Sequence, residues 1–264
     1  MEKKRKKNIL LTLIQIVLIA IMIFSAYKII NYYYQNWNST RQINIAKSSV
    51  ERIEEEHKSE DIEIDKDELA KKIIKELKEQ NKDIVAFVRQ KEAKINFPVA
   101  YVREDNDYYL YRDLEENFSL PGTIFLNGYN EPDFKDMNST LFGHHLKVEN
   151  ADMFAPMFKL LLQYEKPENV DPNKEYIIEL FTEDGYKEYK IFAAYFSDIY
   201  DDYVNPNFDQ DGWTDYLAER RDKSTNSFNF NHEFNENDHI LTLSTCDYVY
   251  DSEKRYVVQG VLVE

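Results

Sequence analysis

The hydrophobic residues of this chain are concentrated at its start and then in short runs after residue 84. Residues 9–30 are almost wholly apolar, and about 20 apolar residues are enough to cross a bilayer as a helix. Residues 1–8 are rich in lysine and arginine, which by the positive-inside rule predicts a cytoplasmic tail and an extracellular remainder. We therefore expect a single-pass signal-anchor helix at residues 9–30, held in the cell membrane.

A cleaved signal peptide is the alternative interpretation of the same segment. Its apolar run is longer than the usual hydrophobic region of about 7–15 residues, and no clear small-x-small cleavage site follows it. Four aromatic residues come next, as in the interfacial belts of membrane proteins: Tyr32, Tyr33, Tyr34 and Trp37. These features favour an uncleaved anchor.

Residues 31–83 are polar and densely charged. The first part has so few apolar residues that we expect no packed core there and interpret it as a stalk, in part helical. Further on, Leu69, Ile73 and Leu77 recur at helical spacing, with Ile84 as a further candidate. They predict an amphipathic helix that packs on the domain that follows. A coiled coil with a partner is the alternative, but sustained heptads are missing.

Residues 84–264 carry short runs of β-branched and aromatic residues separated by turn residues, which predict seven or more strands and a closed or nearly closed barrel. The Asp184-Gly185 pair is a strong hairpin signal between two of them. The expected strands are residues 95–102, 122–126, 139–143, 176–181, 186–195, 240–246 and 255–263.

Two helices are expected between the strands, which makes the fold mainly β with helices, of the α+β class. In residues 152–164, Met153, Met157, Leu160 and Leu161 line one side, and such a stripe is more typical of a core than of a ligand surface. In residues 208–223, four residues repeat at helical intervals: Trp213, Tyr216, Leu217 and Arg220. This second helix precedes a late strand and could form one wall of a groove.

The last two expected strands form a hairpin around the only cysteine of the chain, Cys246. A hairpin brings the end of its first strand to the start of its second, so Cys246 and Arg255 should meet at the loop end. A lone cysteine cannot form an intramolecular disulfide, and it is either a buried inert thiol or a reactive one. An always-charged guanidinium beside it suggests a site that holds an anion or a polarised carbonyl.

A general base or acid would complete such a site, and His144 is the candidate. It follows an extended run that ends in Gly143, so it should lie at the end of a strand, as Cys246 does. A structural, hydrogen-bonded histidine is the competing interpretation. Zinc is disfavoured, because His144 and His145 would point to opposite sides of an extended chain and no second cysteine or spaced His/Glu motif completes a tetrahedral site.

In their order and spacing these motifs resemble the sortases, specifically class B, over about residues 83–263. The residues that carry the resemblance are Leu243-Ser244-Thr245-Cys246, Arg255, Gly143-His144-His145, Asn81-Lys82-Asp83-Ile84-Val85, Phe97-Pro98-Val99, Asp105-Asn106-Asp107-Tyr108-Tyr109-Leu110-Tyr111, Gly122-Thr123-Ile124-Phe125-Leu126 and Met153-Phe154. The long helix around Trp213 also resembles class B rather than class A. One departure is Ala86-Phe87, where the family commonly has Gly-Trp; it is a packing position.

The resemblance implies a sortase β-barrel with an N-terminal helix and a helix between the late strands, anchored outside a Gram-positive cell. It implies a cysteine transpeptidase that cuts an Asn-Pro-x-Thr-(Asn/Gly)-like sorting signal of surface proteins after threonine and joins them to an amine of peptidoglycan. Cys246 would be the nucleophile, His144 the general acid and base, and Arg255 the group that holds substrate and stabilises the oxyanion. It implies no cofactor and no metal.

The resemblance also implies substrate contacts. Asn106 and Leu110, spaced as in the family, would line the signal groove, and Ser244 and Thr245 would flank the thiol. His145 occupies a variable position and is assigned no step. Asp247 could touch substrate or be an exposed turn residue.

Two other functions stay open from the residues alone. One is a cell-surface endopeptidase that uses Cys and His, although papain-like enzymes place Cys before His and here His144 precedes Cys246. The other is a non-catalytic anchored binding module. The net charge of −16 argues against nucleic acid as a partner. Within the family we do not expect a pilus polymerase, because the chain stops at Glu264 without a second membrane segment.

Overall fold

The computed structural model describes residues 2–58, 65–143, 158–246 and 254–263. It divides into two compact units, residues 1–38 and 39–264, and one helix, α1 (Glu2–Lys58), contributes to both. Among the described residues, α1 is the one helix with the length and apolar content of a membrane span. The first unit is therefore compatible with the expected anchor.

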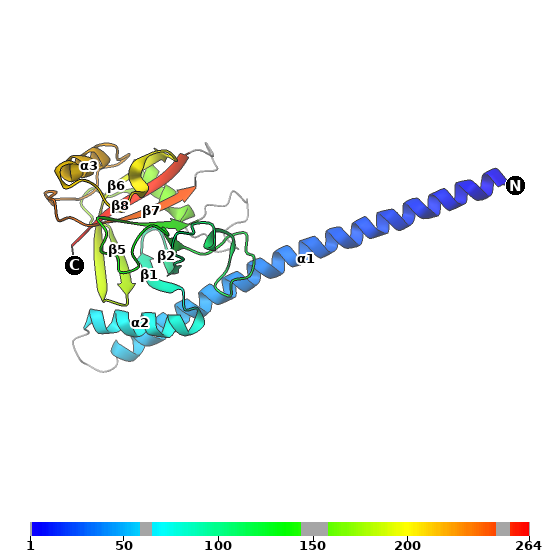
Figure 1. The fold of residues 1–264 in the computed structure, drawn as a ribbon, viewed down its shortest axis with the longest axis horizontal. Coiled ribbons are helices and arrows are strands. Elements are labelled where there is room, and N and C mark those ends of the chain that lie inside the picture. The colour runs from blue at the N-terminus through cyan, green and yellow to red at the C-terminus, as the bar shows by residue number, and fades with distance from the viewer. Residues whose placement is uncertain (1, 59–64, 144–157, 247–253, 264) are drawn as a thin grey trace. The chain divides into compact units, whose positions relative to one another are not determined.

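The second unit is built on a closed β-barrel (Figure 1). Its described strands are β1 (Ile84–Gln90), β2 (Ile95–Ala100), β3 (Phe125–Leu126), β4 (Asn138–Gly143), β5 (Ile177–Thr182), β6 (Tyr186–Asp198), β7 (Ile240–Cys246) and β8 (Lys254–Leu262). They are hydrogen-bonded in the order β1-β2-β3-β4-β7-β8-β6-β5, and β1 pairs with β5 to close the ring. The pairs β2·β3 and β4·β7 are parallel and the rest are antiparallel. The expected barrel of the α+β class is confirmed.

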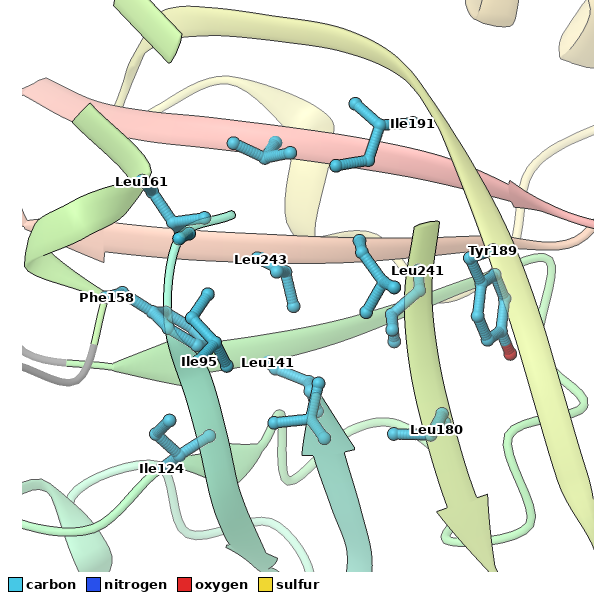
Figure 2. Packing of buried hydrophobic residues seen from close by; sticks show 14 of the residues in the cluster. Ile95, Ile124, Leu141, Phe158, Leu161, Leu180, Tyr189, Ile191, Leu241 and Leu243 are labelled. Atoms are coloured by element: carbon cyan, nitrogen blue, oxygen red, sulfur yellow. The ribbon is translucent and has the colours of Figure 1, made fainter. Parts of the chain in front are cut away.

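Strand β7 is buried on both faces. Leu241 and Leu243 belong to the cluster that fills the barrel, where they face Leu141 of β4 (Figure 2). Ile240 lies on the opposite face and packs in the cluster that contains Trp213. Side chains alternate between the two faces of a strand, so a strand covered on both sides reads as a continuous run of buried residues. The cover on both faces explains why the sequence of β7, ILTLSTC, contains no charged residue.

Two helices cover the outside of the barrel. Helix α2 (Lys66–Gln80) begins at the cap residue Asp65, whose side chain accepts hydrogen bonds from two main-chain amides, and it buries its apolar face as expected. Ile84 is not part of it, because it starts β1. Helix α3 (Gln210–Asp222) buries Trp213, Tyr216, Leu217 and Arg220, which are the four residues that the periodicity indicated.

The end of α1 packs on the barrel unit, so the expectation that the segment after residue 31 lacks enough apolar surface to pack was wrong for residues 39–58. Ala46, Val50 and Ile53 are buried against α2 and the sheet. The helix is also tied to β1 by an ion pair between Arg89 and Glu54 at 2.8 Å. Ala46, Val50 and Ile53 recur every three or four residues, and Glu51 and Arg52, which lie between them, are exposed.

Short 3₁₀ helices complete the described part of the chain: η1 (Tyr109–Tyr111), η3 (Lys159–Glu165), η4 (Pro167–Asn169) and η5 (Asp202–Val204). The helix expected at residues 152–164 overlaps η3 in its C-terminal half. Residues 152–157, which include Met153 and Met157, lie outside the described residues. Phe158 and Leu161 enter the barrel core, in agreement with the interpretation of that stripe as core.

Candidate active site

The β7–β8 hairpin pairs Cys246 directly with Arg255. On the other side of β8, Arg255 pairs with Ser197 of β6. Residues directly opposite each other in antiparallel strands share a face of the sheet. The positions of Cys246, Arg255 and Ser197 therefore form one row across three strands, and the predicted meeting of Cys246 and Arg255 is confirmed at the level of the backbone register.

Arg255 lies at the start of β8 and is half-buried. Its Nη1 donates a hydrogen bond to the main-chain oxygen of Lys254 at 2.8 Å. A guanidinium has five donors in a rigid planar fork, a geometry that suits the recognition of a carboxylate or an oxyanion.

Strand β4 ends at Gly143, which pairs in parallel with Thr245 of β7. In the sequence, His144 follows Gly143 and Cys246 follows Thr245. Strands β4 and β7 are therefore side by side at the residues that immediately precede His144 and Cys246. His144 itself, His145 and Asp247 lie outside the described residues.

The end of β4 is packed tightly against the barrel core. A Cβ atom built on Gly143 would lie only 2.7 Å from the ring of Phe158, which is fully buried. Only glycine leaves room for this contact. The ring of Phe158 therefore fixes the course of the backbone immediately before His144.

Ser244 and Thr245 are each 1% exposed on β7. The Ser244 hydroxyl lies 3.1 Å from the hydroxyl of Tyr203 in η5. Thr245 Oγ1 is buried without a hydrogen-bond partner within the described residues. Both residues precede Cys246 on β7 and are covered in this structure, and Tyr203 is one of the groups that contact Ser244.

Asn106 is half-buried, and both the nitrogen and the oxygen of its amide bond within the protein. Its Nδ2 donates to Asn127 Oδ1 at 3.0 Å, and its Oδ1 accepts from the main-chain amide of Gly128 at 2.7 Å. Asn127 in turn donates from its own Nδ2 to the main-chain oxygen of Val204 at 3.0 Å. Asn106 is thereby linked to the segment that contacts Ser244.

Leu110 is half-buried at the edge of a small apolar cluster of Ala100, Tyr109 and Phe125. Phe142 of β4 packs on the same cluster and is also only partly covered. The two side chains provide apolar surface one residue before the end of β4, which suits the expected role of Leu110 in holding a peptide.

Sequence reasoning missed the buried polar residues behind this site. Asn138 Nδ2 donates to the main-chain oxygens of Tyr203 and Asn205, at 2.8 and 3.0 Å, and its Oδ1 accepts from Thr242 at 2.7 Å. Asn138 is fully buried, and such a side chain must find partners, but its burial is visible only in the fold and not in the sequence. Among the described residues, no group of three His, Cys, Asp or Glu side chains is placed to hold a metal.

Comparison with known proteins agrees with this geometry. The Sortase domain model matches residues 92–263. The chain belongs to the sortase family. It is 32% identical over 199 residues to sortase B of Listeria monocytogenes, covering 72% of this chain and 74% of that one. It is 28% identical to sortase B of Staphylococcus aureus over 256 residues, 96% of this chain and 97% of that protein.

The same relationship is seen in three dimensions. A structure of the Staphylococcus aureus sortase B–substrate complex aligns with a TM-score of 0.71 and 26% identity, over 88% of this chain and 99% of that one. The sequence and structural relatives together make this sortase a member of class B. Class B sortases are cysteine transpeptidases of the cell wall, and this enzyme is one of them.

The Gly143–Phe158 contact generates a prediction. Gly143→Ala should lower kcat/KM of the folded enzyme by about tenfold or more, because the added methyl displaces either Phe158 or the backbone that leads to His144. The same overpacking should lower the stability by about 1–3 kcal/mol. Gly212→Ala in α3 is the matched control, since nothing lies within 4 Å of its added methyl. It should leave kcat/KM unchanged and, as a glycine removed from a helix, keep or raise Tm. Equal activity of the two variants would contradict a positioning role for Gly143.

Proposed function

We propose that this sortase cleaves a sorting signal of the Asn-Pro-x-Thr-(Asn/Gly) kind after threonine and transfers the protein to an amine of the cell wall. The observation that supports it best is the register that sets Cys246 opposite Arg255, with β4 ending alongside. The substrates would be surface proteins that carry such a signal. One of the structural relatives is itself a sortase B–substrate complex.

The first half of the reaction would be acyl transfer to sulfur. The Cys246 thiolate attacks the threonine carbonyl carbon, and the carbonyl electrons move to oxygen. The guanidinium of Arg255 donates hydrogen bonds to this oxyanion, where a fixed positive donor has its largest effect. The carbon–nitrogen bond then breaks, and His144 gives its proton to the departing amine. The products are a thioester at Cys246 and the released C-terminal peptide.

The second half would reverse the direction of these steps. An acceptor amine attacks the thioester carbon and loses a proton to His144, and the thiolate leaves as the new amide forms. Substrate contacts would come from Asn106, Leu110, Ser244 and Thr245. In the described structure Leu110 offers partly exposed apolar surface, whereas Asn106 and Ser244 act by holding the segments around the site.

We also propose the location of the enzyme. Residues 9–30 would anchor it in the membrane, with residues 1–8 in the cytoplasm and the catalytic domain outside. The apolar helix at the N-terminus and the basic residues before it support this orientation. The anchored enzyme would then meet both the secreted protein and the peptidoglycan amine at the outer surface.

Cys246→Ala should reduce turnover of a sorting-signal peptide to background, because no other cysteine exists to replace the nucleophile. Mass spectrometry of the wild-type enzyme mixed with the peptide should show an acyl adduct on Cys246. If the alanine variant turned over the peptide at the wild-type rate, Cys246 would have no part in the reaction.

Arg255→Lys should lower kcat by about 10²–10³-fold, the effect of losing an oxyanion donor, because an ammonium cannot reproduce the planar fork. Lys254→Ala changes the exposed neighbour of Arg255 and is the matched control. If Arg255→Lys and Lys254→Ala have the same kinetics, Arg255 has no part in stabilising charge on the substrate.

The endopeptidase alternative makes an opposite prediction about acceptors. With a transpeptidase, raising the concentration of an amine such as triglycine should shift products from hydrolysed to ligated peptide while peptide consumption holds or rises. The measurement is the ratio of the two products by liquid chromatography. A ratio that stays at zero across all amines tested would favour the hydrolase.

A further inference from the structure

Helix α3 carries a charged residue on its buried face, in the last turn. Arg220 is 3% exposed. Its Nη1 and Nη2 donate to the two carboxylate oxygens of Asp201 at 2.9 and 2.8 Å, and Nη2 also donates to Asp202. The guanidinium lies 4.5 Å from the ring centroid of Tyr216 and 5.9 Å from that of Tyr195. We call this arrangement the Arg220 clamp.

The clamp holds part of residues 199–205, the first seven residues between β6 and α3, which we call the connector. Asp201 also accepts a hydrogen bond from Ser197 Oγ at 2.9 Å, and Ser197 is the cross-strand neighbour of Arg255. Two residues further on, Tyr203 lies against Ser244, two residues before Cys246. The clamp thus reaches the strand position beside Arg255 through Ser197. On the other side, Tyr203 contacts β7 at Ser244, two residues before the proposed nucleophile.

The two halves of the connector are held in different ways. Residues 203–205 are bound to the barrel through the side chains of Asn127 and Asn138. The first half has an exposed surface, with Tyr200 83% exposed and Ile199 37% exposed. Asp201 and Asp202 bond this half to Arg220, and Asp201 also bonds to Ser197. Lys223 lies 3.7 Å from Asp201, and Asp198 of β6 accepts from the main-chain amide of Tyr200 at 3.0 Å.

The charges of the clamp favour the arrangement in which Asp201 and Asp202 stay bound to Arg220. Burial is the largest single effect and would raise the pKa of Asp201. The hydrogen bonds with Arg220, Asp202 and Ser197 and the charge of Arg220 together outweigh it and hold that pKa well below its usual range. If the connector moved away, the buried guanidinium of Arg220 would lose the carboxylates of Asp201 and Asp202. Its charge would then be unpaired, which is strongly unfavourable. The two-pronged contact also needs arginine, because a lysine ammonium cannot bind both oxygens in the plane of the carboxylate.

We propose that Arg220 is a positioning residue that sets the connector against the end of β7 and thereby determines how tightly the sorting signal is held. The proposal rests on the proposed transpeptidase function of this site. Arg220 does not touch the reacting atoms. Its effect would pass through Tyr203 to Ser244 and through Asp201 to Ser197 beside Arg255.

The experiment compares Arg220→Met, Arg220→Lys and the matched control Arg221→Met in the full-length enzyme. Arg221 is the next residue of the helix and is exposed. Three quantities are measured: KM and kcat for a sorting-signal peptide, the rate at which iodoacetamide alkylates Cys246, and the rate of chymotrypsin cleavage after Tyr200, located by mass spectrometry. Thermal unfolding is recorded for each variant.

Arg220→Met should raise KM by about tenfold, a change equivalent to about 1.4 kcal/mol of binding, with a smaller change in kcat. Cleavage after Tyr200 should be at least several times faster, alkylation of Cys246 should stay within about twofold, and Arg220→Lys should fall between wild type and Arg220→Met. If Arg220→Met does not fold, Arg220→Lys carries the same comparison. Arg221→Met should match the wild type.

A loss of activity that follows only the folded fraction, with KM and Tyr200 cleavage unchanged, would overturn the proposal and leave Arg220 a structural residue. The failure of the proposed function looks different. In that case the wild type itself turns over no sorting peptide, while cleavage after Tyr200 still reports whether Arg220 holds the connector.

Discussion

The site depends on the register of strand β7. It pairs in parallel with β4 on one side and antiparallel with β8 on the other, so two independent ladders of hydrogen bonds fix where Cys246 lies. Side chains alternate with a period of two. A shift of one residue would therefore move Leu241 and Leu243 out of the barrel core and turn all the other side chains of β7 to the wrong face as well. The energy of the hydrophobic core therefore also sets the alignment of the chemistry.

Much of this arrangement could be predicted from the sequence because its signals are local. The β7–β8 hairpin, with Cys246 and Arg255 at its ends, follows from two apolar runs and a polar connection. The buried stripe of α3 follows from helical periodicity, and the Asp184-Gly185 turn follows from turn chemistry. The main-chain amide of Thr182 donates to the carbonyl of Gly185 at 2.9 Å, and the amide of Gly185 donates to the carbonyl of Thr182 at 3.3 Å. In each case the residues that decide the structure are neighbours in the chain.

The parts that could not be predicted depend on distant partners. Nothing in the sequence of β4 or β7 says that they lie side by side, and nothing in β1 indicates that it closes the barrel on β5. The packing of Ala46, Val50 and Ile53 was hidden by the charges between them. The network of Asn138, Thr242 and Tyr203 could not be foreseen because polar residues reveal their role only when their partners are known.

The contact between Gly143 and Phe158 has a consequence for the evolution and engineering of this enzyme. Phe158 is a core residue by burial, yet its ring touches the last residue before the proposed acid–base group. A mutation selected for thermal tolerance at Phe158 or its neighbours would also move the catalytic end of β4. Robustness and turnover are therefore coupled at this end of the barrel, and a search for hardier variants has more freedom on the α2 side.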